Sequence, residues 1–201
     1  MLISEFLERL KRRLKDEGVY HKYSNEELLA SLNQEQNIII SEFEMNVNHY
    51  TKEVSPEDNI LHLDKIALKI ILAKLNKKLI ELKNYKKHLE NENIDAHLMS
   101  FSNMQSVALM PKEKANGLLE VWANVCVFHK SENEKLFLND LLVNALLYGV
   151  FKNVLQSENS ELTLQKISFY ERLYNNEISR LRAIVSNTRE KEILFSKVSR
   201  I

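Results

Sequence analysis

Glycine, proline and cysteine are scarce in this chain of 201 residues, which contains three, two and one of them respectively. So few glycines and prolines leave little scope for a loop-rich or sandwich fold, and we therefore expect helix to dominate. The lone cysteine, Cys126, excludes an internal disulfide framework and a multi-cysteine zinc site, and it fits synthesis in a reducing cytosol. We expect Cys126 to be a small core residue rather than a nucleophile.

The chain also lacks net charge and long apolar runs. Its 28 basic and 28 acidic residues balance, so no overall field attracts nucleic acid or an anionic membrane. The most apolar stretch, residues 66–75, is interrupted by Lys69 and Lys74, and the first residues lack the apolar core of a signal peptide. We therefore expect one globular domain, with or without a protruding element, that is neither exported nor inserted in a membrane.

The short motifs of common catalytic and metal sites are missing as well. Three glycines cannot form a phosphate-binding loop, and the nucleophile elbow of hydrolases is absent. The nearest approach to a metal-binding spacing is His62 with Asp64, a pair that is more often a plain surface pair. We therefore expect a protein that is not an enzyme and that needs no cofactor or metal. The remaining histidines are scattered: His21, His49, His88, His97 and His129.

Three amphipathic helices are predicted in the first half of the chain, over residues 3–18, 24–50 and 55–87. The second begins with a capping box formed by Ser24 and Glu27, and Ser55-Pro56 has the order that favours a helix N-terminus. The third helix would be rich in lysine, either as a solvated face or as a surface for DNA or an acidic partner. Contact with DNA would involve Lys77, Lys78, Lys86 and Lys87.

After residue 91 the hydrophobic period changes from that of a helix to that of a strand. Residues 104–110 and 118–128 are predicted to be extended, and Asn116-Gly117 between them suits a chain reversal. We therefore predict a β-hairpin over residues 104–128. Both faces of its second strand carry apolar groups, so it should be stable only when it packs on the helices or on a neighbouring chain.

The helical period returns for residues 141–155 and 164–185, which predicts two more helices. Gly149 in the first of them indicates either a close helix crossing or a neutral, tolerated glycine. The predicted fold is thus mainly α: a bundle of about five helices with an inserted β-hairpin, which fills residues 1–187. An extended C-terminal tail, residues 188–201, would be a frayed extension or an arm that becomes ordered on a partner.

Three stretches of the sequence resemble the head-to-tail connector (adaptor, or head-completion) proteins of tailed bacteriophages. The opening resembles the short first helix of these proteins and the Ser-x-x-Glu-Leu-Leu helix that follows it. The middle resembles a strand that leads to an Ala-Leu-x-Tyr helix. The end resembles a terminal helix that contains tyrosine. Asn139 departs from the pattern, because a proline often precedes the fourth helix. The matching segments are EFLERLKRRLKD (5–16), YSNEELLASLN (23–33), LLEVWA (118–123), LFLNDLLVNALLY (136–148) and FYERLYNNEISRL (169–181).

The resemblance implies a structural virion protein, made in the host cytoplasm, that forms a ring of twelve copies in the neck between the portal and the tail. The ring would continue the channel for DNA, which passes through without sequence-specific binding. By analogy, the C-terminal segment would dock on the portal through Ile193, Leu194, Phe195, Val198 and Ile201. Contacts between subunits or with the tail would involve Lys112, Glu113, Lys114 and Trp122.

Two other functions remain open at this stage. A cellular helical scaffold or regulatory protein could use the same hairpin and tail to bind a protein partner, as a dimer or a hetero-complex rather than as a ring. A nucleic-acid-binding protein could use the lysines of the third helix, and its affinity would then fall steeply with salt.

Overall fold

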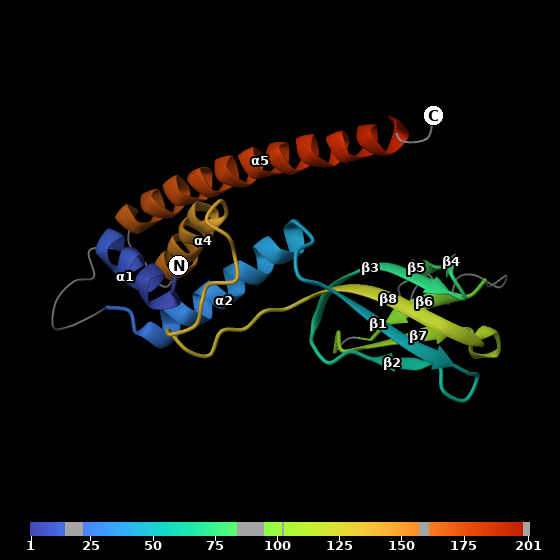
Figure 1. The fold of residues 1–201 in the computed structure, drawn as a ribbon. Coiled ribbons are helices and arrows are strands. Elements are labelled where there is room, and N and C mark those ends of the chain that lie inside the picture. The colour runs from blue at the N-terminus through green and yellow to red at the C-terminus, as the bar shows by residue number, and fades with distance from the viewer. Residues whose placement is uncertain (15–21, 84–94, 102, 157–160, 199–201) are drawn as a thin grey trace. The chain divides into compact units, whose positions relative to one another are not determined.

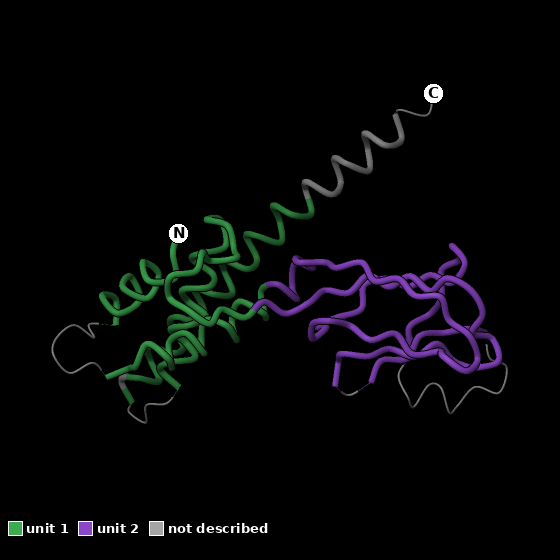
Figure 2. Tube along the Cα trace, turned by 60° about the horizontal axis from the view of Figure 1, so that its bottom comes forward, with its two compact units in different colours: residues 1–39, 128–201 green, residues 40–127 purple. Residues whose placement is uncertain are grey.

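The chain folds into two compact units, of which the second is inserted into the first. The computed structural model describes residues 1–14, 22–83, 95–101, 103–156 and 161–198. Residues 1–39 and 128–201 form a helical unit, and residues 40–127 form a β unit (Figure 2). The prediction of a mainly α bundle is therefore wrong, because the described residues contain eight strands as well as four helices.

The helical unit is built from both ends of the chain. Its helices are α1 (Ile3–Leu14), α2 (Asn25–Glu42), α4 (Val143–Leu155) and α5 (Glu161–Val198), and the last three residues of α2 belong to the β unit. The predicted capping box is confirmed, since the Glu27 backbone N–H donates to the Ser24 hydroxyl and the Ser24 N–H donates to the Glu27 carboxylate. These reciprocal bonds explain why α2 begins here.

The core of the helical unit is formed by the apolar stripes of its four helices. The ring of Phe151 on α4 stacks on Tyr170 of α5 with centroids 4.6 Å apart, and Lys152 lies over the ring of Tyr174. Side chains with no exposed surface come from α1, α2 and α4, and the largest of them are Ile3, Phe6, Leu10, Leu28, Leu32, Ile39, Leu146 and Phe151. The helix predicted over residues 3–18 is confirmed for Ile3–Leu14, its described part. The helix predicted over residues 141–155 is confirmed from Val143, whereas Leu141 of its predicted stripe lies before α4 and is 57% exposed.

Helix α5 is longer than the sequence pattern predicted. It continues without a break from Glu161 to Val198, so that residues 188–198 of the predicted tail have a helical backbone. Residues 199–201 lie outside the described part of the chain, and the side chains after residue 186 are not described. The structure therefore places the start of the tail on a helix, and its docking role stays a prediction.

The β unit contains two four-stranded sheets. One has the order β1-β8-β3-β4 and the other β2-β7-β6-β5, and all neighbouring strands are antiparallel except β5 and β6 (Figure 1). The bounds are β1 (Val47–Val54), β2 (Ile60–His62), β3 (Ala67–Leu75), β4 (Lys78–Leu79), β5 (Glu81–Lys83), β6 (His97–Ser100), β7 (Ser106–Met110) and β8 (Gly117–Val125).

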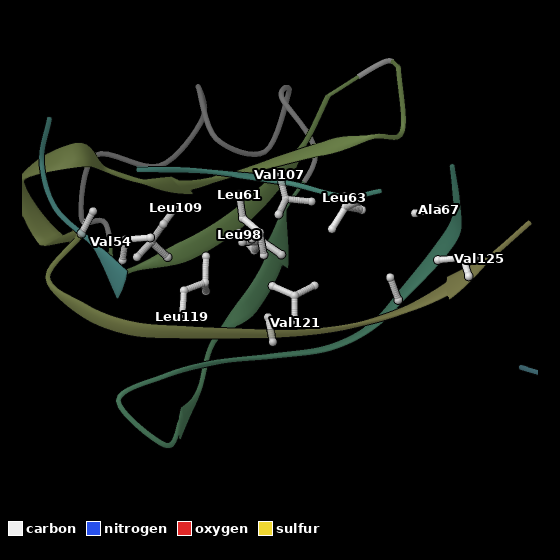
Figure 3. Packing of buried hydrophobic residues seen from close by; sticks show 13 residues of the cluster. Val54, Leu61, Leu63, Ala67, Leu98, Val107, Leu109, Leu119, Val121 and Val125 are labelled. Carbon is white, nitrogen blue, oxygen red and sulfur yellow. The ribbon is translucent and has the colours of Figure 1, made fainter. Parts of the chain in front are cut away.

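The two sheets of the β unit enclose its hydrophobic core. Figure 3 shows Leu119 and Val121 of β8 pointing toward side chains of the other sheet, Leu61, Leu98 and Leu109. The predicted alternation along the second extended segment is confirmed, because Leu119, Val121, Ala123 and Val125 have no exposed surface.

The predicted third helix is wrong, since residues 60–83 form strands β2 to β5. Ser55 and Asp58 close a turn instead of capping a helix, through two backbone hydrogen bonds of 3.2 and 3.0 Å. Asn76 and Lys77 both have positive φ, of 50° and 69°, and link β3 to β4 as a two-residue hairpin turn. The apolar spacing of this segment fits a helix equally well, but its β-branched residues and this turn favour strands.

The predicted β-hairpin is wrong in its pairing, although both of its strands exist. β7 pairs with β2 and β6, whereas β8 pairs with β1 and β3 in the other sheet. A 3-10 turn at Lys112–Lys114 lies between them, and the chain passes from one sheet to the other. The apolar side of β8 is thus buried within its own chain, so it no longer indicates assembly. The second helix also ends earlier than predicted, at Glu42 rather than near Tyr50, because β1 begins at Val47.

Gly149 marks a close helix contact, one of the two interpretations left open by the sequence. A Cβ atom at this position would lie 2.3 Å from Cγ and Cδ of Glu35, a residue of α2 with no exposed surface. The Glu35 carboxylate accepts a hydrogen bond of 3.0 Å from the side chain of Asn153, one turn further along α4. The missing side chain of Gly149 therefore leaves room for a buried carboxylate.

We predict that Gly149→Ala destabilises the helical unit by about 1–3 kcal/mol, because the overpacking exceeds the helix-propensity gain of ~1 kcal/mol. Urea unfolding followed by the helical circular dichroism signal measures this change. In a Glu35→Ala background the same substitution should cost less, because the obstructing side chain is gone. An equal cost in both backgrounds would mean that Glu35 is not the obstacle.

Candidate interaction surfaces

Trp122, one of the predicted contact residues, lies half-buried on the outer face of the sheet β1-β8-β3-β4. Its ring stacks on His49 of β1 with centroids 4.2 Å apart, and the Nζ atom of Lys74 on β3 lies 5.2 Å from its centroid. Because β1 and β3 flank β8 on opposite sides, the indole is held between neighbours from its own sheet. Trp122 therefore ties three strands together, and its contact with another subunit stays a prediction.

Lys112, Glu113 and Lys114 are exposed on the short 3-10 turn between β7 and β8. The Nζ atom of Lys114 lies 3.9 Å from the carboxylate of Asp95, a loose surface pair. The turn is thus on the surface, as an inter-subunit or tail contact requires. Their contact with another subunit or with the tail stays a prediction.

The lysines proposed for a DNA channel do not share a helix face. Lys77 and Lys78 are exposed at the turn from β3 to β4, whereas Lys86 and Lys87 lie outside the described residues. The interpretation of residues 55–87 as a lysine-rich helical surface is therefore wrong. The two described lysines instead form a small basic group at one end of a sheet.

The portal-docking residues of the sequence prediction fall on the end of α5 or beyond it. Ile193, Leu194, Phe195 and Val198 have a helical backbone, and Ile201 lies outside the described residues. Leu194 and Val198 are four positions apart, a spacing that places them on one side of a helix.

A shallow groove on the first turns of α5 is a surface feature that the sequence analysis missed. It is lined by Glu161, Leu164, Gln165, Ser168, Phe169 and Arg172, and we call it the α5 groove. Leu164 is 62% exposed and Phe169 47% exposed, whereas the stripe of α5 that packs in the helical unit includes buried Ile178 and Leu181. The sequence contains only a weak signal for the α5 groove, because Leu164 was predicted to belong to that buried stripe.

A second feature that the sequence analysis missed is the segment that returns from the β unit, residues 129–136, which we call the strap. Asn33 of α2 holds it by two hydrogen bonds, since its amide donates to the His129 carbonyl and its oxygen accepts the His129 N–H, at 2.9 and 2.8 Å. The strap also binds the start of the chain, where the Ile3 and Ser4 N–H groups donate to the carbonyls of Glu134 and Glu132.

The side chain of His129 lies in a polar pocket beneath the strap. Its Nδ1 is 3.0 Å from the Glu134 carboxylate and its Nε2 is 3.2 Å from the Gln36 side-chain oxygen, and His129 is 7% exposed. The pKa of Glu134 is held below its ordinary value, first by the hydrogen bond with His129 and next by the N–H groups of Lys130 and Ser131. These contacts hold the strap in place, and both ring nitrogens of His129 lie within hydrogen-bond distance of a side-chain oxygen.

Cys126 is buried, as the sequence indicated. Burial raises the pKa of its thiol, so the protonated form is favoured.

Within the described residues, no three His, Cys, Asp or Glu side chains come together as metal ligands do, and none of the helices could cross a membrane. The chain matches no protein-family model and no curated protein.

We predict that the two faces of β8 differ in their effect on stability. Leu119→Ala removes a fully buried side chain and should cost about 2–5 kcal/mol. Trp122→Ala, on the outer face, should cost less than ~2 kcal/mol because its ring is only half-buried. Thermal unfolding followed by circular dichroism compares them, and a larger cost for Trp122→Ala would reverse our assignment of the two faces.

We also predict a specific acid sensitivity of the strap. The lowered pKa of Glu134 means that its ionised form stabilises the fold above the ordinary glutamate pKa of about 4.3, and that this contribution is lost as pH falls through the lower, folded-state pKa. Glu134→Gln should therefore lower the melting temperature near neutral pH and weaken its fall on acidification below ~4.3. Glu171→Gln, an exposed position on α5, is the control and should leave the pH profile unchanged.

Proposed function

We propose that this protein is a structural subunit of a homo-oligomeric ring, an adaptor between the portal and the tail of a tailed bacteriophage, and that it performs no catalysis. The observation that supports this proposal best is the α5 groove, where Leu164 and Phe169 are both exposed on the first turns of one helix. Apolar side chains gathered in a hollow gain free energy when a partner covers them. The phage assignment itself comes from the resemblance of the sequence.

Further apolar side chains are exposed around the strap, in the same helical unit. The Leu136 N–H donates to the Met1 carbonyl, and Leu2 pairs with Lys135 in a β-bridge. Leu2 is 38% exposed, Phe137 40% and, further along, Leu141 57%. An isolated subunit thus leaves apolar surface on its helical unit, as expected for a protein that completes its burial among identical copies.

The last turns of α5 are the proposed portal contact. They carry Leu194, Phe195 and Val198 at helical spacing, and the helix that begins at the α5 groove continues into them without interruption. A continuous helix gives such an arm a defined direction, so it loses less conformational freedom on docking than a flexible tail would.

The ring is tested by native mass spectrometry and electron microscopy of the purified protein, alone and mixed with a portal ring. Leu164→Ser/Phe169→Ser should prevent ring formation and leave the helical signal unchanged, because both side chains are exposed in the single chain. The matched control is Lys166→Ser/Glu171→Ser, which changes two exposed polar residues in the same turns and should still form rings.

Deletion of residues 188–201 tests the portal contact separately. The truncated chain should keep a folded helical unit, because the stripe that packs in this unit includes Ile178 and Leu181, and should fail to join the portal ring. A dimer or a complex with an unrelated protein, in place of any ring, would instead favour the cellular scaffold function.

A further inference from the structure

β1 is an edge strand whose outer side faces no other described strand. It lies at the end of the order β1-β8-β3-β4 and pairs with β8 over all eight of its residues, without a bulge. The Val125 N–H donates to the Asn46 carbonyl, so in this antiparallel pair every second residue from Asn46 onward bonds to β8. The backbone N–H and C=O groups that point away from β8 therefore belong to Val47, His49, Thr51 and Glu53.

The side chains along this edge leave it open to another strand. The four residues whose backbone points outward are all exposed, and none is a proline or a glycine. Lysine often guards an edge strand. The one lysine of β1, Lys52, is bound within its own chain, since its Nζ donates to the Asp58 carboxylate at 2.5 Å and to the Ile60 carbonyl at 2.6 Å. A regular edge of this kind is a template for strand addition.

The outer face of β1 is complementary to itself when the strand is turned around. Two β1 strands can bond to each other only in registers where outward-pointing residues face outward-pointing residues. The register centred on Thr51 places His49 of each copy opposite Glu53 of the other, and Thr51 opposite itself. Pairs of opposite charge and Thr–Thr pairs both stabilise neighbouring strands. A register centred on Tyr50 would instead face His49 with Thr51, and one centred on His49 would face this histidine with itself.

The side chain of His49 is held in position within its own chain. Its ring stacks on Trp122 with centroids 4.2 Å apart and planes 10° from parallel, and its Nε2 lies 3.5 Å from the Glu120 carboxylate. Thr51 is β-branched and therefore restricted at χ1. Both side chains thus lose little conformational freedom when a second strand faces them.

The inner face of β1 also tolerates this register. There Tyr50 would face Lys52 of the second copy, and Asn48 would face Val54, so no like charges meet. The Tyr50 hydroxyl donates to Asp64 of its own chain at 2.5 Å, and Lys52 is bound as described above. The contact therefore leaves the bonds between the two edge strands β1 and β2 of one chain in place.

We propose that two copies of this chain join through their β1 strands in an antiparallel, two-fold contact centred on Thr51, so that the sheet continues from one copy into the other. The facing pairs His49–Glu53, Thr51–Thr51 and Glu53–His49 would each exchange two backbone hydrogen bonds, which supply the affinity. The facing side chains set the register.

This contact goes beyond the proposed ring and uses none of its surfaces, which lie on the helical unit. Neighbours within one cyclic ring are joined by two different surfaces, whereas a two-fold contact uses the same surface on both copies. The β1 contact therefore joins free subunits, or subunits of two separate rings.

Amide hydrogen exchange at single residues tests the contact without any substitution. The N–H groups of His49, Thr51 and Glu53 should exchange rapidly in dilute solution and become protected as the concentration rises, because only the second copy accepts them. The N–H groups of Tyr50 and Lys52 bond to β8 and are the internal control, which should be protected at every concentration. Rapid exchange of the first three in a dimer detected by sedimentation would overturn the contact.

Thr51→Pro tests the same edge with little effect on the subunit itself. The N–H of Thr51 points away from β8, so proline removes a donor that only an added strand would use, and it does so twice at the centre of the dimer. We expect sedimentation and native mass spectrometry to show dimerisation weakened by about a hundredfold, with an unchanged melting temperature in dilute solution. Thr51→Val keeps the N–H and the branched side chain and is the matched control, which should dimerise like the unmodified chain.

Two charge variants test the register. His49→Glu makes carboxylates face each other twice, and Glu53→Lys removes the acid that faces the histidine, so each variant alone should dimerise about two- to fivefold more weakly. In an equimolar mixture, native mass spectrometry should show heterodimers in excess, because the new carboxylate of one chain faces the new ammonium group of the other. His49→Glu mixed with Glu113→Lys is the control and should give no excess. A statistical mixture in both cases would overturn the register centred on Thr51.

Failure of the inference and failure of the proposed function give different results. Leu164→Ser/Phe169→Ser should still dimerise, and Thr51→Pro should still form rings with a portal ring. A dimer that is insensitive to Thr51→Pro, or a purified chain that forms only monomers or single rings, would overturn the β1 contact, and rings on the portal would leave the adaptor proposal standing. Dimers that are sensitive to Thr51→Pro, without a ring under any condition, would support the β1 contact and overturn the ring.

Discussion

The helical unit depends on the hydrogen bonds that hold the strap, because its two chain segments are separated in the sequence by the entire β unit. Asn33 binds the backbone of His129 on both its donor and its acceptor, as a neighbouring strand would. The strap in turn binds the backbone of Ile3 and Ser4. These hydrogen bonds join three segments that are distant in the sequence: the start of the chain, α2 and the strap. Helices α4 and α5 come after the strap in the chain.

Asparagine side chains also hold the two ends of the β unit together by hydrogen bonds to the backbone. The amide of Asn124 donates to the carbonyl of Met45 and to that of Ile40, and the amide of Asn46 donates to the carbonyl of Val125 at 2.9 Å. Residues near the entry and the exit of the insert are thus bound to each other within the unit. Since its core also lies between its own two sheets, the β unit has the features of an independently folding domain.

The sequence predicted well where one local signal dominates. The capping box of Ser24 and Glu27 located the start of α2, and the strict alternation around Val121 identified β8 and its buried face. For Gly149 the sequence left a close helix contact and a tolerated glycine equally open, and its partner, Glu35, could not be found from the sequence. These features depend on spacing within a few residues, which is what a single sequence records most directly.

The prediction failed where the outcome depends on partners far away in the chain. Residues 63–82 have apolar positions that suit a helix, but pairing with β8 gives residues 67–75 a strand conformation. Asn76 and Lys77 both have positive φ, as residues of a two-residue hairpin turn do, and the helical spacing around them concealed this turn. The same long-range pairing moved Lys77 and Lys78 from a presumed helix to the end of a sheet.

The corrected fold changes the physical basis for assembly. The sequence suggested an unpaired hairpin that needs a partner, yet the inner side of β8 is fully buried within its own chain. Among the described residues, the features available for assembly include exposed apolar side chains on the helical unit, represented by Leu164 and Phe169, and the edge strand β1. Side-chain burial contributes affinity with little direction, whereas strand pairing fixes direction and register. A subunit that offers both can join copies of itself through two separate surfaces, one on each unit, which is what an assembly with both a cyclic and a two-fold contact requires.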